Sequence, residues 1–335
     1  MNLVNGTRAW LRLFRAHTAV LEAPMAVLGA AIGLGTFFDY RVGLWLIFGV
    51  MYHFVGYGMN SYVDWDKGFD KEDERKQHHP LNTGEIKPDN AKKVIGVSFI
   101  LLFAYLAYLT HSSYVGLGLT CLMVVSGVAY NYFGKYTSLK AVPIAVAHTL
   151  VFFIPYYMYT DSITLFSVLM TTAYFIHHIY QIAISGDIKD VDQDEASLIQ
   201  KLGASIHRDF EKDIDVFTSS GKILIIAYTL TVLQMAFSFG SMYSARDSIY
   251  PVALGGVFAA LTFYDTDNML QPGKFRRNKR IEYMSRREFF GYSMVHTAAI
   301  PVIGWKAYGL LLISMLVYLG TVSKFIWGNW LVPEV

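Results

Sequence analysis

The stretch Asn60-Ser-Tyr-Val-Asp64-Trp-Asp66-Lys-Gly-Phe-Asp70 ends a long apolar segment, and a second acidic stretch, Asp187-Ile-Lys-Asp190-Val-Asp-Gln-Asp194, ends another. Seven of the 26 acidic residues lie in these two short windows. Acidic side chains at the edge of a membrane segment are costly, so they usually mark a functional site. Carboxylate clusters also suit Mg²⁺, which prefers oxygen ligands and is commonly shared with substrate phosphates. The two windows therefore predict a membrane enzyme that acts on a diphosphate.

The composition indicates a polytopic membrane protein of the all-α class. The chain is 54% hydrophobic and only 16% charged, whereas a soluble domain carries about 25% charged residues. Apolar runs near membrane-spanning length recur along the whole sequence. The last run is long enough for one kinked helix or two short ones, because Pro301 and Gly304 interrupt it. We expect about nine segments, at 17–36, 43–59, 94–110, 114–132, 141–159, 163–184, 222–240, 249–264 and 288–326.

The basic residues alternate between the two sides of these segments. The N-terminus and the loops after the even-numbered segments hold 24 of the 28 lysines and arginines, whereas the opposite loops hold only Arg41 and Arg246. Because positive charge is retained on the cytoplasmic side, the N-terminus and both acidic loops are predicted to be cytoplasmic. We expect a single transmembrane domain over 1–335, with cytoplasmic cap loops at 60–92, 185–221 and 265–287, and no nucleic-acid partner.

Helical spacing brings the acidic residues of each window together. Asn60 and Asp64 are four residues apart and share a helix face, and Gly68 can end the helix so that Asp70 turns back toward it. In the second window Asp187, Asp190 and Asp194 are spaced i, i+3 and i+7, so they also share a helix face. The two windows occupy equivalent places in a weak internal repeat, which suggests two similar bundles that each contribute a metal-binding edge. The predicted metal ligands are Asn60, Asp64, Asp66, Asp70, Asp187, Asp190 and Asp194.

Taken alone, either acidic window could be a solvated helix end at the membrane surface rather than a metal site. Two such windows on the same predicted membrane side argue against it. Together they resemble the aspartate-rich signatures of the UbiA superfamily of intramembrane prenyltransferases. That family's first signature is Asn-x-x-x-Asp with a further Asp, then basic residues, Pro-Leu and a Gly. In this chain the matching positions are Asn60, Asp64, Asp70, Arg75, Pro80-Leu81 and Gly84-Glu85-Ile86.

The spacing from Asp64 to Asp70 is most similar to the menaquinone-branch enzymes of this family, and the second window to its chlorophyll, tocopherol and archaeal-lipid branches. Three departures stand out. His78-His79-Pro80 replaces the frequent Arg-Pro, and the stretch 205–221 looks longer than the usual loop. The family's Tyr-x-x-x-Lys fits either Tyr130 with Lys135 one position late, or Tyr136 with Lys140, and we expect Lys135 to be the lysine that meets phosphate.

The resemblance implies a single helical bundle around a central apolar cavity. It further implies Mg²⁺ as cofactor, an isoprenyl diphosphate as substrate, and a hydrophobic aromatic or lipid acceptor within the bilayer. The catalytic residues would be Asp64, Asp70, Asp187, Asp190 and Lys135. The substrate-binding residues would be Asn60, Arg15, Arg75, Tyr130 and Lys140.

Three alternative functions are a terpene cyclase or elongase of the same fold, a cation transporter and a CDP-alcohol phosphotransferase. Members of the same fold cyclise or elongate terpenes, and the departures at His78 and Gly134 keep that reading open. A cation transporter would place its acids near the bilayer midplane, whereas these lie at one predicted surface. A CDP-alcohol phosphotransferase would carry Asp-Gly-x-x-Ala-Arg, which is absent from the sequence. His177 and His178 are expected to be buried, hydrogen-bonded histidines rather than a catalytic base or acceptor-binding group.

Overall fold

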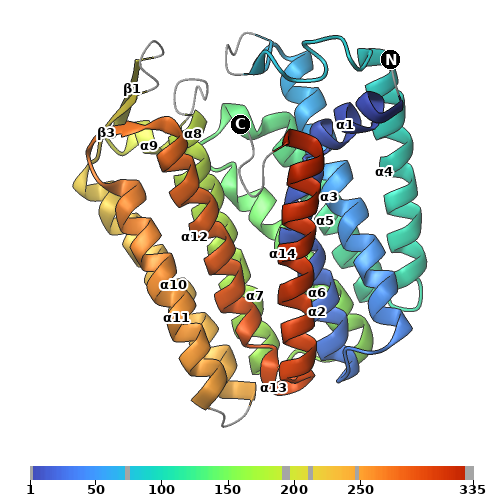
Figure 1. The fold of residues 1–335 in the computed structure, drawn as a ribbon. Helices are drawn as coiled ribbons and strands as arrows, with labels where there is room; N and C mark the ends of the chain where they lie inside the picture. Colours follow the sequence, from blue (N-terminus) through green and yellow to red (C-terminus); the bar gives the residue numbers. More distant parts are fainter. Residues whose placement is uncertain (1–2, 72–75, 191–196, 210–213, 246–248, 329–335) are drawn as a thin grey trace. The chain divides into compact units, whose positions relative to one another are not determined.

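The computed structural model describes residues 3–71, 76–190, 197–209, 214–245 and 249–328. Within these ranges the chain is almost entirely helical (Figure 1). The long helices are α1 (Leu3–Leu13), α2 (Ala19–Leu34), α3 (Tyr40–Asp66), α4 (Pro88–Thr110), α5 (Tyr114–Phe133), α6 (Ala141–Thr160), α7 (Leu165–Tyr180), α10 (Gly221–Ala245), α11 (Ile249–Leu270), α12 (Arg277–Thr297) and α14 (Trp305–Trp327). The predicted all-α bundle class is confirmed.

Eight of the described helices are long and apolar enough to cross a membrane: α2, α3, α4, α5, α6, α10, α11 and α14. The helix α7 is shorter, and a π-helical segment, η4 (Gln181–Gly186), continues it into α8 (Asp187–Asp190). The last predicted segment is two helices rather than one. The short helix α13 (Ile300–Ile303) and Gly304, with φ of 82°, separate α12 from α14. Proline and glycine therefore act here as the sequence suggests.

A small antiparallel sheet lies where the sequence suggested only a long polar loop. It consists of β1 (Ser205–Asp209), β2 (Ile214–Thr218) and β3 (Gly273–Arg276), in the order β1-β2-β3. Ile206 pairs with Phe217, both side chains are buried, and their neighbours His207 and Thr218 are exposed. This period of two is a strand signal. It was missed because charged residues dominate the stretch.

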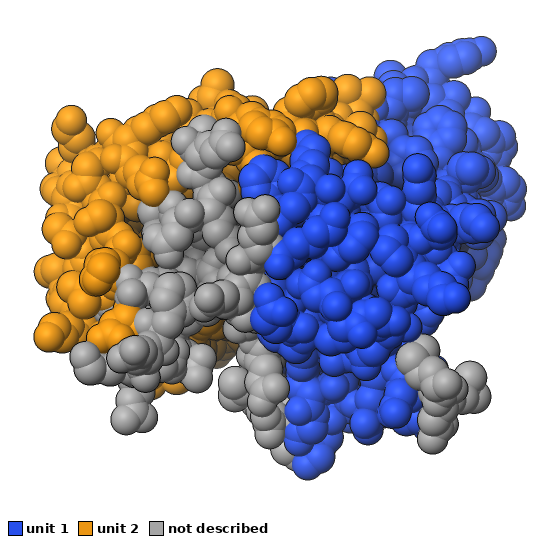
Figure 2. All heavy atoms as spheres, turned by 90° about the horizontal axis from the view of Figure 1, so that it is seen from above, with its two compact units in different colours: residues 1–124, 154–159, 306–335 blue, residues 125–153, 160–305 orange. Residues whose placement is uncertain are grey.

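The described chain divides into two compact units, coloured separately in Figure 2. Unit 1 comprises Met1–Val124, Ile154–Tyr159 and Lys306–Val335, and unit 2 comprises Val125–Phe153 and Thr160–Trp305. The helices α5 and α6 contribute residues to both units. The first acidic window belongs to unit 1 and the second to unit 2. The units do not simply follow the two halves of the sequence, because the last helix, α14, belongs to unit 1.

Small residues allow the helices of unit 1 to pack closely. A Cβ atom at Gly49 of α3 would lie 2.7 Å from the Cα of Ala23 in α2, so the two backbones meet at this glycine. A Cβ at Gly33 would lie 2.8 Å from the carbonyl oxygen of Tyr156. Close approach at glycine is the usual way in which membrane helices gain packing contacts.

Unit 2 combines helix pairs with an apolar cluster beneath its sheet. The helix α10 packs against α7, and α11 packs against α12. A short helix, α9 (Leu198–Lys201), supplies Ile199 to a core that also contains Tyr180, Phe217 and Met269. Because Ile184 and Ile188 belong to the same core, the chain around Asp187 is anchored on both sides.

We expect Gly49→Ala to lower the melting temperature, because the new methyl group has backbone atoms in its way. Overpacking of this kind costs about 1–3 kcal/mol. Gly43→Ala is the matched control in the same helix, since no atom lies within 4 Å of a Cβ there. Thermal unfolding of the purified variants measures both. Equal melting temperatures for the two variants would contradict the close contact between α2 and α3.

Candidate active site

The first acidic group is built where α3 ends in unit 1. The helix ends at Asp66, and Gly68 follows with φ of 95°, a conformation that glycine adopts without strain. The chain then turns back, so that the backbone amide of Asp70 donates to the carbonyl oxygen of Asp64 at 3.3 Å. The turn predicted at Gly68 is therefore confirmed, and it brings Asp70 beside Asp64.

The residues of this group differ in burial. The side chains of Asp64 and Asp70 are buried, with only 5% and 1% of each residue exposed. Asn60 is half-buried, and Asp66 is exposed to solvent. The Nζ of Lys76 lies 2.6 Å from Oδ1 of Asp70. A buried carboxylate needs such a cation, because an uncompensated charge away from water is strongly destabilising.

Asn82 connects three parts of this loop and was not singled out from the sequence. Its Oδ1 accepts a hydrogen bond from Nε1 of Trp65 at 3.0 Å. Its Nδ2 donates to the carbonyl oxygens of Asp70 and Lys76, each at 2.8 Å. One amide side chain thereby fixes the end of α3, the second buried acid and its lysine. The only local signal is an asparagine shortly after Pro80, which is typical of turns.

Arg15 and His79 also belong to unit 1. The guanidinium of Arg15 lies over the ring of Tyr57, with 5.4 Å between Cζ and the ring centroid. Burial lowers the pKa of His79 to about 4, and the nearby Asp70 carboxylate opposes this shift only in part. The His79 ring is therefore neutral near pH 7. His79 stands before Pro80, where the family often has arginine, and unlike arginine it adds no positive charge to the loop.

The second acidic group is organised around Asp187 in unit 2. This residue is only 1% exposed. Its Oδ2 accepts from the backbone amide of Leu198 at 2.6 Å and from Oγ of Ser197 at 3.3 Å, at the start of α9. Its Oδ1 lies 2.6 Å from Nζ of Lys140, which is buried as well. Asp187 thus has a fixed orientation and a paired charge, as Asp70 has in unit 1.

Local backbone geometry places Asp187 at this point. The π-helical segment η4 comes directly before it and widens the turn between α7 and α8. Such segments are rare and frequently accompany functional sites. Asp187 and Asp190 begin and end the single turn α8, so the predicted spacing of three residues is kept in the backbone.

The two candidate lysines follow the end of α5. A Cβ at Gly134 would lie 3.4 Å from the ring of Tyr130 and 3.6 Å from the Cβ of Lys140. Tyr130 and Lys140 therefore both lie next to Gly134. The ammonium group of Lys140 contacts Asp187. Lys135 is half-buried in the 3₁₀ turn Gly134–Tyr136 that follows α5. Lys140 thus contacts the second acidic group directly, through Asp187.

Several predicted site residues lie outside the described residues. These are Arg75, Asp194 and the side chain of Asp190. Within the described ranges, no group of three or more histidine, cysteine, aspartate or glutamate side chains is arranged to hold a metal ion. The donors that are described nevertheless fit Mg²⁺. They are carboxylate and amide oxygens, the ligands that Mg²⁺ prefers. In each unit a lysine ammonium group lies against one of the buried carboxylates.

The histidines of α7 are buried side chains, as predicted. His177 is fully buried, and Nε2 of Gln234 lies 3.1 Å from its Nδ1. The same Gln234 accepts from Arg287, another fully buried residue, at 3.3 Å. His178 is buried beside Tyr292, with ring centroids 5.6 Å apart. These contacts describe a polar network in the core of unit 2.

Comparison with known proteins identifies the family of this chain. The model of the UbiA prenyltransferase family matches residues 23–290, most of the chain. This chain belongs to the UbiA prenyltransferase family. It is therefore an integral membrane prenyltransferase, in agreement with its eight apolar helices of spanning length. A search of curated protein sequences gave no match.

Solved structures share the fold at low sequence identity. A UbiA homologue from Archaeoglobus fulgidus bound to GPP and Mg²⁺ is 14% identical, with a TM-score of 0.61 over 88% of this chain and 99% of that one. A digeranylgeranylglyceryl phosphate synthase is 17% identical, with a TM-score of 0.60 over 89% and 97%. The apo UbiA homologue from Aeropyrum pernix K1 is 17% identical, with a TM-score of 0.59 over 90% and 98%.

We expect Lys140→Ala to lower kcat/KM more than Lys135→Ala. The sequence alone favoured Lys135, but removing Lys140 takes away the ammonium group that lies 2.6 Å from the buried Asp187 carboxylate. Breaking one partner of a buried ion pair costs about 3–5 kcal/mol. Steady-state kinetics with varied isoprenyl diphosphate measures both variants. A strong effect of Lys135→Ala with a silent Lys140→Ala would restore the alignment suggested by the sequence.

Proposed function

We propose that this enzyme transfers an isoprenyl group from its diphosphate to an aromatic or lipid acceptor in the bilayer, with Mg²⁺ as cofactor. The observation that carries the proposal is the pair of acidic groups, each with a buried aspartate and a lysine 2.6 Å away. A diphosphate with Mg²⁺ needs both kinds of group: carboxylates for the metal and cations for the phosphate oxygens. Membership of the UbiA family supports this reading.

Related structures support the choice of donor and metal. UbiA homologues from Archaeoglobus fulgidus have been solved with GPP and Mg²⁺ and with DMAPP and Mg²⁺. We carry both the isoprenyl diphosphate and Mg²⁺ over to this chain as part of the proposal. In unit 1 the metal would be held by Asn60, Asp64, Asp66 and Asp70, and in unit 2 by Asp187, Asp190 and Asp194. Bound Mg²⁺ neutralises charge on the leaving diphosphate.

The chain's own residues orient these groups. The turn at Gly68 and the amide of Asn82 fix the backbone of Asp70. The start of α9 fixes one oxygen of Asp187, so its other oxygen keeps a set direction. Burial of these carboxylates limits the water around them, which strengthens their attraction for cations. The proposed diphosphate contacts are Arg15, Arg75, Tyr130, Lys135 and Lys140.

The proposal includes location and domain organisation. We propose that the N-terminus and both acidic loops face the cytoplasm, because 24 of the 28 basic residues fall on that predicted side. The family match runs continuously through residues of both units. The match over residues 23–290 supports one catalytic domain, and we propose that this domain spans residues 1–335.

Removing a buried acid should abolish turnover. Asp64→Asn and Asp187→Asn each take a negative charge from a proposed metal site, so we expect kcat to fall by on the order of 10²-fold or more. Asp89→Asn, at an exposed position in the first turn of α4, is the matched control in unit 1. EDTA should inactivate the wild type, and added Mg²⁺ should restore it. Full activity of either buried variant, or activity in EDTA, would overturn the proposed metal sites.

Product formation should depend on a separate acceptor. Membranes that contain the enzyme are incubated with labelled geranylgeranyl diphosphate and Mg²⁺, with or without an added pool of lipid and aromatic acceptors. Transfer predicts a labelled product that requires the acceptor pool and is lost in Asp64→Asn. A labelled terpene formed equally well without acceptor, and lost in the same variant, would identify a terpene cyclase instead.

A further inference from the structure

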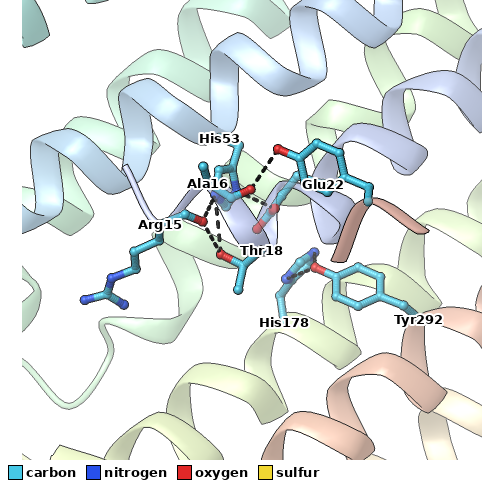
Figure 3. Close-up of polar contacts among 8 residues, drawn as sticks. Arg15, Ala16, Thr18, Glu22, His53, His178 and Tyr292 are labelled. Atoms are coloured by element: carbon cyan, nitrogen blue, oxygen red, sulfur yellow. Dashed lines mark hydrogen bonds and ion pairs between the residues drawn. The ribbon is translucent and has the colours of Figure 1, made fainter. Parts of the chain in front are cut away.

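The chain bends sharply between α1 and α2, and Arg15 lies at the bend (Figure 3). Its backbone is left-handed, with φ of 46° and ψ of 44°. A residue with a side chain pays about 1–2 kcal/mol for this conformation. Surrounding contacts must therefore hold it in place. Because Arg15 is a proposed diphosphate contact, what holds its backbone also determines where its guanidinium lies.

Several donors converge on the backbone of this bend. The carbonyl oxygen of Arg15 accepts from the Oγ1 of Thr18 at 2.8 Å, and Nε2 of His53 lies 3.0 Å from it. The next carbonyl, that of Ala16, accepts from the hydroxyl of Tyr318 at 2.9 Å. His53 comes from α3 and Tyr318 from α14, so two other helices of unit 1 fix the bend.

His53 is itself oriented by a second buried residue. Its Nδ1 lies 2.7 Å from Oε2 of Glu22 in α2, and each of the two residues is only 1% exposed. Figure 3 shows Glu22, His53 and the Arg15 carbonyl in a row. Both residues lie within apolar helices of membrane-spanning length, where an ionisable pair is costly and is usually retained for function.

The geometry fixes how many protons the pair holds. A carbonyl oxygen only accepts, so Nε2 of His53 must carry the hydrogen that points to Arg15. The 2.7 Å contact between Nδ1 and Glu22 then needs one further proton between these two atoms. That proton gives either imidazolium with carboxylate or neutral imidazole with carboxylic acid. The pair is electrically neutral in both forms, which suits its burial.

The pair is connected to the arginine side chain as well as to its backbone. The ring of Tyr57 lies 4.4 Å from the His53 ring, centroid to centroid. The Arg15 guanidinium lies over the same tyrosine ring at 5.4 Å. Tyr57 is one helical turn before Asn60 on α3. The guanidinium is thereby held next to the helix that carries the first acidic group.

We propose that Glu22 and His53 form a proton-sharing pair that positions Arg15 to bind the substrate diphosphate. The inference rests on the proposed function, because it concerns the diphosphate site of that reaction. Neither residue touches the reacting atoms; both act through Arg15. The pair makes the left-handed bend stable, and the bend sets the direction of the guanidinium.

Binding measurements test this role directly. The probe is geranylgeranyl thiolodiphosphate with Mg²⁺, titrated into the purified full-length protein without acceptor. His53→Phe and Glu22→Leu remove the hydrogen-bonded pair, and we expect Kd to rise roughly tenfold or more, the range for one charge-assisted hydrogen bond. Glu22→Gln is the matched control. Its amide can donate to Nδ1 while Nε2 still donates to Arg15, so Kd should stay within about twofold of the wild type.

A double-mutant cycle separates positioning from a general loss of structure. In an Arg15→Gln background the guanidinium is already gone, so adding His53→Phe should change Kd by less than about twofold. Glu22→Leu gives the same cycle should His53→Phe not fold. Equal losses with and without Arg15, or equal Kd for Glu22→Leu and Glu22→Gln, would overturn the proposal. A wild type that neither binds the probe nor transfers a prenyl group would instead overturn the proposed function.

Discussion

The cost of burying a carboxylate at the end of a membrane helix is the constraint on which this structure depends. Asp70 and Asp187 are both almost fully buried, and a lysine amine lies 2.6 Å from each. Backbone amides or carbonyls hold the surrounding chain, through Asn82 in one unit and the start of α9 in the other. Charge that is paired and oriented in this way can remain away from water.

The two units reach the same arrangement by different local means. Unit 1 uses a glycine turn after α3 and a long loop that returns to it. Unit 2 uses a π-helical segment, a one-turn helix and a small sheet. The sheet does not contribute an acid to the described site. Phe217 of β2 and Ile199 of α9 belong to one apolar core, so the sheet supports the short helix that binds Asp187.

Buried polar and charged groups in the interior of the described chain are compensated by their neighbours. Glu22 and His53 share a proton within unit 1, and His177 accepts a neutral amide contact within unit 2. Arg287 is a fully buried cation that lies over the ring of Tyr180, with 3.2 Å between Cζ and the ring centroid. An aromatic face compensates a buried guanidinium in part. Each device keeps a polar group in an apolar bundle without an isolated charge.

The sequence by itself determined the membrane class, most helix positions and the family. The class and the helix positions follow from composition and from apolar runs of spanning length, and the family follows from the resemblance of the two acidic windows to its signatures. The break at Pro301 and Gly304 and the turn at Gly68 were also readable, because both residue types restrict or free the backbone in known ways. The sheet was not readable, since its alternation of Ile206 and Phe217 is short and lies among charged residues.

Only the tertiary structure decided the partners. Lys140 and Asp187 are 47 positions apart, Trp65 and Asn82 are 17 apart, and Glu22 and His53 are 31 apart. Nothing in a local pattern indicates which lysine meets which acid, because the pairing depends on how distant helices pack. For the same reason the contact of Lys140 with the buried Asp187 could not be predicted, although the sequence offered both Lys135 and Lys140 as candidates. Pairing of buried charge is a three-dimensional property, and it gives each of the two acidic windows a buried aspartate with a fixed partner.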